Sequence, residues 1–162
     1  MRWDRLFADL ESTAADAVAD ERDALAHDLR DEQWAGLRWR DLLGGASALQ
    51  VEGLGTVAGR VVAAGDLVLL DAGGQWWAVV PEAVLAVVST DGRAQPVPPL
   101  RRSRRQFLRA LRDEAGEVRL ARRDGSVVTG RVTAAGDDFV QVETAGRRVS
   151  VPWPAVSALT EA

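Results

Sequence analysis

The densest group of residues that could do chemistry is a series of arginines in the second half of the chain. It comprises Arg101, Arg102, Arg104, Arg105, Arg109 and Arg112, followed by Arg119, Arg122 and Arg123. Guanidinium groups neutralise phosphates, so arginines gathered in one patch are typical of a nucleic-acid-binding surface. Two other interpretations stay open. The arginines could form a solvated helix face, or they could pair internally with an acidic segment at the start of the chain.

Charge is distributed unevenly along the sequence. Residues 1–33 hold ten Asp and Glu against four Arg, whereas residues 101–131 hold ten Arg against four acids. All twenty basic residues are arginine, and the formal net charge is -4. Such asymmetry suggests that the chain has a partner. The acidic segment nevertheless weakens any positive field around the arginines.

Side chains that usually carry catalysis are sparse. His27 is the only histidine, and there is no cysteine. One histidine makes no triad or zinc site, and the adjacent Asp137 and Asp138 suit a turn better than an acid–base pair. The glycine-rich segments 53–59 and 72–74 lack the lysine and the following helix of a phosphate-binding loop. We therefore expect no enzymatic activity, no metal and no cofactor.

The sequence contains no evident membrane or export signal. The start of the chain lacks the basic and apolar regions of a signal peptide, and no segment approaches the roughly 18 apolar residues of a membrane span. The absence of cysteine excludes disulfides. We expect a cytoplasmic protein without membrane contact, and 162 residues suit one domain or two small ones.

The first part of the chain is expected to be helical. Apolar residues between Trp3 and Leu29 recur at spacings of three, four or seven, which predicts an amphipathic helix over residues 2–29. Asp31 is placed to cap a second helix that ends at Gly44. The long helix is expected to form a lid on a sheet or, alternatively, to mediate oligomerisation.

An internal repeat organises the rest of the chain. The triplet 59–61 recurs at 130–132, and the segment 63–66 recurs at 134–137. One inserted residue, Asp138, restores the register for further matches. These pair Val68, Gly74, Val79, Ala83, Val84 and Ala86 with Val140, Gly146, Val151, Ala155, Val156 and Ala158, and upstream of the insertion Leu49 matches Leu120. We infer that residues 48–89 and 118–160 are two copies of one unit.

Each copy reads as a helix followed by five short strands separated by turn residues. The first copy predicts strands at 49–52, 56–63, 67–71, 76–80 and 84–89. The second predicts strands at 117–122, 127–134, 139–144, 148–151 and 157–160, with Asp124-Gly125 as a hairpin turn. Between the copies, residues 90–100 contain three prolines and read as a linker, and residues 101–114 read as a helix.

Successive side chains of a strand point to opposite faces, so the sequence assigns the residues of each strand to an inner and an outer face. In the second copy Val128, Val132 and Val140 face inward, whereas polar residues face outward. The first copy also carries Leu67 and Leu69 on its outer side, so a neighbour must cover it. We expect that neighbour to be the N-terminal helix or the second copy. The stretch 76–80 is apolar on both sides, which favours packing over an aromatic ligand platform.

The second copy resembles the Sm-like superfamily, which includes Hfq and the archaeal and eukaryotic Sm proteins, and also resembles small bacterial SH3-like barrels. The residues that carry this resemblance are Asp124-Gly125, Gly130, Val132, the segment 136–140, Val151-Pro152 and Ala155-Val156. The whole chain is similar to uncharacterised actinobacterial proteins with a long N-terminal helix.

The resemblance implies a mainly β protein with α: two tandem five-stranded Sm/SH3-like barrels, each preceded by helix. The expected parts are a helical segment (1–45), barrel A (46–89), a linker (90–100), and a helix with barrel B (101–162). The family also implies RNA binding in a ring, with an asparagine that reads a base. Gln141 stands at that place and has the groups to hydrogen-bond a base edge.

We therefore expect a non-enzymatic interaction or scaffold module that binds a protein partner or itself. Unpaired strand edges, such as those of 76–80 and 84–89, favour strand addition unless barrel B already pairs with them. The alternative is an RNA- or DNA-binding regulator that uses the arginine-rich helix 101–112, the adjacent strand and Gln141. No small-molecule substrate is evident from the sequence.

Overall fold

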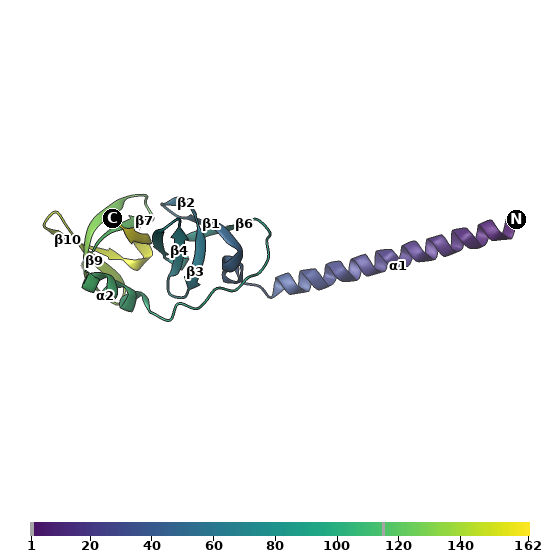
Figure 1. Ribbon diagram of the computed structural model, residues 1–162, viewed down its shortest axis with the longest axis horizontal. Helices are drawn as coiled ribbons and strands as arrows, with labels where there is room; N and C mark the ends of the chain where they lie inside the picture. The colour runs from purple at the N-terminus through teal and green to yellow at the C-terminus, as the bar shows by residue number, and fades with distance from the viewer. Residues whose placement is uncertain (1, 115) are drawn as a thin grey trace. The chain divides into compact units, whose positions relative to one another are not determined.

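The computed structural model describes residues 2–114 and 116–162, with the side chains of 16, 18–114 and 116–162. The protein is mainly β with some helix. Its chain divides into two compact units, residues 1–38 and 39–162, and Figure 1 shows the elements of each.

The first unit is one long helix, α1 (Arg2–Ala35). The predicted break at Asp31 is wrong, because the helix continues through this residue to Ala35. No strong helix breaker occurs before Gly36, so the acids after Leu29 extend the helix. Val18, Leu25 and Leu29 lie exposed on it. No helix in the described part of the chain is long and apolar enough to cross a bilayer.

In its described residues, the second unit holds eleven strands, one α-helix and three short 3-10 helices. Its first half comprises η1 (Trp39–Gly45), β1 (Ala46–Val51), β2 (Gly55–Ala58), β3 (Arg60–Ala64), β4 (Val68–Ala72), β5 (Gln75–Val79), η2 (Pro81–Ala83) and β6 (Val84–Ser89). Its second half comprises α2 (Arg104–Glu114), β7 (Glu117–Arg122), β8 (Val127–Ala135), β9 (Phe139–Thr144), β10 (Arg147–Pro152), η3 (Trp153–Ala155) and β11 (Val156–Glu161).

The strands form two open sheets rather than two closed barrels. One sheet has the order β2-β1-β6, and the other has the order β10-β9-β8-β7-β11-β5-β4-β3. The expectation of separate barrels failed because β11 pairs with β7 on one side and with β5, from the first half, on the other. The two halves therefore share one continuous sheet.

Two glycines permit the strands to bend where a side chain would collide with the neighbouring strand. A Cβ on Gly59 would meet the carbonyl oxygen of Asp71, and a Cβ on Gly130 would meet that of Glu143. At Gly59 the predicted strand 56–63 divides into β2 and β3, which belong to different sheets. At Gly130 the strand β8 continues without a break.

The core consists of the inward faces that alternation predicts. Val128, Val132 and Val140 are buried, as are their counterparts Val57, Val61 and Val68. On the outer side of the first half, Leu67 is fully buried and Leu69 is half-buried. This confirms that the outer side is covered.

The segment 90–100 contains no helix or extended strand, as expected, yet it is not a free linker. Gln95 exchanges backbone hydrogen bonds with η1: its amide donates to Asp41 and its carbonyl accepts from Gly44, both at 2.9 Å. Further on, the Ala64 amide donates to Pro98 at 3.1 Å, and the Leu100 amide donates to Ala64 at 2.9 Å. This segment, here called the strap, is fixed against β3 and η1.

Helix α2 follows the strap and lies against the sheet, mainly at β8. Its Leu108 is fully buried, and Phe107 and Leu111 pack against the same apolar core. Leu69, on the outer side of β4, borders the same cavity as Phe107. The sequence predicted that a neighbouring segment covers the outer apolar side of the first half, and the strap and α2 are part of that cover.

Candidate functional site

Arg104 is the most tightly held of the predicted nucleic-acid-binding residues. It begins α2, and its guanidinium Nη2 donates to Glu82 Oε1 at 2.7 Å. Its Nε donates to the carbonyl of Asp66 at 2.8 Å, and its guanidinium carbon lies 5.2 Å from the centroid of the Trp153 ring. Arg104 therefore ties α2 to three separate segments, with few donors left for a phosphate.

The contact with Arg104 affects the pKa of the Glu82 carboxyl group. Partial burial by itself raises its pKa, but the hydrogen bond from Arg104 and the positive charge of that guanidinium outweigh burial. The pKa of Glu82 consequently lies below its ordinary value of 4.5. Glu82 therefore stays ionised at neutral pH, which suits a structural link.

Half of the other eight arginines in the series also have acidic neighbours. Arg105 Nη1 lies 3.1 Å from Asp137, Arg112 Nη2 lies 2.9 Å from Asp113, Arg122 Nε lies 3.9 Å from Asp124, and Arg123 Nη1 lies 3.5 Å from Glu52. Arg101, Arg102, Arg109 and Arg119 are exposed and form no salt bridge with the described residues. The series thus extends from the loop before α2 through α2 and β7 to the turn after β7, and five of its nine members are paired with acids.

Gln141 lies on the outer side of β9 within a small polar network. Its Oε1 accepts from the Thr133 hydroxyl at 3.1 Å, and its Nε2 donates to the Ser150 hydroxyl at 3.2 Å. Both ends of the amide are therefore engaged by neighbouring strands. None of the nine arginines contributes to this network.

Residues suited to catalysis or metal binding do not gather. The His27 Nε2 lies 3.9 Å from Asp31 on the exposed surface of α1. Among the residues that the structure describes, no group of three His, Cys, Asp or Glu side chains is placed to hold a metal ion.

The junction between the two halves occupies one of the two strand edges expected to be free, that of 76–80, through the exception that the second half pairs with it. Strands β5 and β11 pair antiparallel, with Ala158 opposite Val79, Leu159 opposite Ala78 and Thr160 opposite Trp77. The junction contains two buried hydroxyls: Ser157 donates to the carbonyl of Glu52, and Thr160 donates to that of Trp76. Ser157 and Thr160, placed among the apolar residues of this strand, were the available signal, since buried hydroxyls need partners.

The terminal strands of the two sheets are β2, β6, β3 and β10, whereas β5 is not an edge because it pairs with both β4 and β11. In the described structure, β6 pairs only with β1, and β10 pairs only with β9. Along β6, Leu85 is 67% exposed and Val88 is 37% exposed, and Trp39 borders the same shallow groove as Leu85. An exposed apolar edge is a template for pairing with another strand.

Comparison of the sequence with protein-family models and with curated proteins finds no match.

Proposed function

We propose that the protein is a non-enzymatic interaction module that assembles with copies of itself through the open edges of β6 and β10. The observation that carries the proposal is the pairing of β5 with β11, which joins the two halves edge to edge. In the repeat inferred from the sequence, β10 corresponds to β5, and β6 corresponds to β11. The open edges are therefore the counterparts of the two strands that already pair.

The proposal includes the inference that the halves are copies of one Sm-like unit of five strands. Matching backbone hydrogen bonds support it. The Glu52 amide donates to Ala83 at 2.9 Å, and the Arg123 amide donates to Ala155 at 3.0 Å, at corresponding positions. Each half also has a 3-10 turn that begins at or next to a proline, η2 or η3, before its last strand.

The β5–β11 register, applied to the counterparts, predicts the contact between molecules. Val79 corresponds to Val151 and Ala158 corresponds to Ala86, so Val151 of one copy lies opposite Ala86 of the next. Ser150 then lies opposite Val87. Such a contact joins two different edges, so it produces a closed ring or a filament rather than a two-fold dimer.

The edge positions that donate hydrogen bonds follow from strand alternation. The Val88 carbonyl accepts from the Ser47 hydroxyl of β1 at 3.2 Å, so Val88 faces β1 and Val87 faces the open edge. A proline at Val87 removes an outward donor and leaves the β1–β6 ladder in place. By correspondence, Ser150→Pro does the same on β10.

The experiment is to measure oligomeric state by size-exclusion chromatography with light scattering. The unmodified protein is expected to form an assembly, and Val87→Pro and Ser150→Pro are each expected to be monomeric. Each variant keeps one intact edge, so a mixture of the two should form a dimer of one copy of each. This complementation distinguishes edge pairing from general destabilisation.

Charge at the same edge offers a second test with a matched control. Leu85→Lys places a cation on the exposed side of β6 and is expected to weaken assembly. Val127→Lys changes another exposed apolar residue, on β8, and is expected to leave assembly intact. A monomeric unmodified protein, or equal effects of the two lysines, would contradict the proposal.

A further inference from the structure

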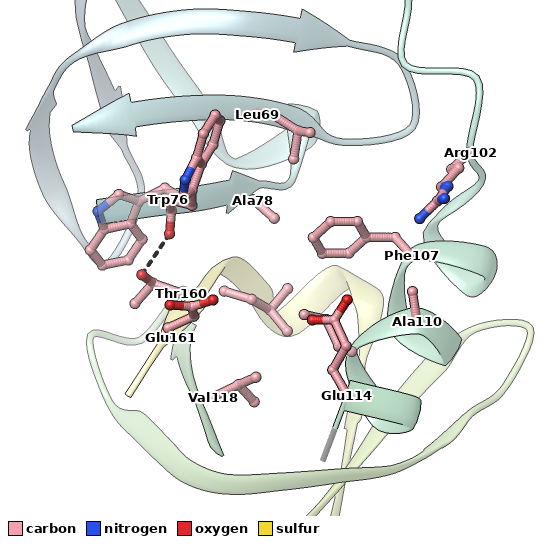
Figure 2. Close-up of a pocket in the computed structure, with 13 residues that line it drawn as sticks. Leu69, Trp76, Ala78, Arg102, Phe107, Ala110, Glu114, Val118, Thr160 and Glu161 are labelled. Atoms are coloured by element: carbon pink, nitrogen blue, oxygen red, sulfur yellow. Dashed lines mark hydrogen bonds between the residues drawn. The ribbon is translucent and has the colours of Figure 1, made fainter. Parts of the chain in front are cut away.

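A cavity of about 270 Å³ lies between α2 and the face of the sheet formed by β4, β5 and β11. Figure 2 shows Phe107 extending from α2 toward Leu69 and Ala78, which form part of the wall. The walls are largely apolar, and Val118 and Leu159, which also line the cavity, are buried. A dry cavity of roughly 150 Å³ suffices for benzene, so this one has space for an aromatic ring with a short chain.

The rim of the cavity is acidic on one side. Glu114 reaches it from α2 and Glu161 from β11 (Figure 2), and an adjoining groove shares both residues and adds Glu117. These three carboxylates are exposed and form no salt bridge with any described residue. By contrast, Arg104, Arg105 and Arg112 of the preceding segment are each paired with an acid. Negative charge at the rim is therefore not neutralised within the described structure.

The opposite side of the rim carries Arg102, on the far side of Phe107 from Glu161 (Figure 2). The opposite charges on the two sides of the rim therefore orient a ligand that has one positive end. Its cation lies toward Glu114 and Glu161, and its apolar body lies away from them. Trp76 is 50% exposed and also lines the cavity. Its indole is suited to contact an ammonium group, because cations are attracted to aromatic faces.

We infer that this cavity binds a small organic cation with an aromatic body, of the arylalkylammonium class. The apolar walls take the ring, and the two glutamates take the ammonium. This site is separate from the open edges of β6 and β10, so it does not depend on self-assembly.

The experiment compares three probes of similar size on the full chain: phenethylammonium, 2-phenylethanol and 3-phenylpropionate. Binding is followed by Trp fluorescence and by calorimetric titration. We expect a dissociation constant on the order of 1 mM for the ammonium, as for other ligands of this size. Two rim carboxylates should favour it over the alcohol by roughly three- to tenfold at low salt, and the carboxylate probe should bind most weakly.

Variants separate the two parts of the site. Glu114→Gln combined with Glu161→Gln should abolish the preference for the ammonium over the alcohol but retain binding of the alcohol. Ala110→Phe should fill the cavity and remove binding of every probe. Glu21→Gln, an equivalent exposed change on α1, is the matched control and should change nothing. Circular dichroism and urea unfolding verify that each variant is folded.

The inference is overturned if none of the probes binds at concentrations up to about 10 mM, tenfold above the expected constant. It is equally overturned if the alcohol or the carboxylate binds as tightly as the ammonium. Retention of the ammonium preference in the double glutamine variant would place the cation elsewhere and would also refute it.

Discussion

Thr160, on β11, donates its hydroxyl hydrogen to the backbone carbonyl of Trp76, on β5, at 2.6 Å. The two residues come from different halves of the second unit, and Thr160 is 4% exposed. Ser157 makes an equivalent contact from the same strand to the carbonyl of Glu52. The junction is therefore held by side chains as well as by the strand ladder.

Replacing Thr160 with valine should loosen this junction. The change keeps the shape of the side chain but removes the donor of a part-buried hydrogen bond, which costs about 1 kcal/mol in the free energy of unfolding. Urea denaturation measures the loss. Thr129→Val, at an exposed position of β8, is the matched control and should cost less than about 0.5 kcal/mol. Equal losses in the free energy of unfolding of the two variants would contradict a specific role of the Thr160 hydroxyl.

Gly130 should not tolerate even a methyl group. An added Cβ would collide with the Glu143 carbonyl of β9, which belongs to a rigid ladder. We expect Gly130→Ala to destabilise the protein by about 2–3 kcal/mol. The same substitution at Gly116 meets open space and should be nearly neutral. Thermal unfolding of the pair compares the two sites directly.

Breaking the Arg104–Glu82 pair should change the pH dependence of stability. Because the folded pKa of Glu82 lies below 4.5, its contribution is present above that pH and is lost as the pH falls through the lowered value. Arg104→Gln should therefore destabilise the protein at pH 7, by about 1 kcal/mol for a partly exposed pair. The gap to the unmodified protein should narrow below pH 4.5. A gap that is constant with pH would assign the loss to packing on Trp153 instead.

The arginine series offers a test between scaffold and nucleic-acid binding. The combined change of Arg101, Arg102, Arg105 and Arg109 to alanine spares Arg104 and should leave the oligomeric state unchanged. Ultraviolet absorbance of the purified protein should show no nucleic acid. Co-purified nucleic acid that salt removes, and that the quadruple variant fails to retain, would instead support an RNA- or DNA-binding regulator.

The second half of the chain was the more predictable from sequence. Its alternation is clear, with Val128 and Val132 inward and Thr129 and Arg131 outward, and the predicted strands correspond closely to β7–β11. Asp124-Gly125 forms the predicted turn, with Gly125 at a φ of 85° and its amide bonded to Arg122 at 3.0 Å. Local patterns sufficed here because each strand pairs with a neighbour close in sequence, apart from β11.

The features that sequence reasoning missed depend on contacts between distant segments. Nothing local in 90–100 indicates that Gln95 bonds to η1 or that Pro98 bonds to Ala64. The arginines were read as one patch because they are adjacent in sequence, yet their acidic partners lie as far away as Glu52. The sheets are likewise open because β11 pairs with β5, and no local sequence pattern specifies that pairing.

The central position of β11 has a consequence for how the protein is made. This strand is synthesised after every other strand of its sheet, yet it lies between β7 and β5 in the eight-stranded sheet. Until residues 156–161 are synthesised, the β5 edge of the first half therefore lacks its partner strand and is bare. During synthesis that bare edge is the point at which a nascent chain is most exposed to pairing with the wrong neighbour.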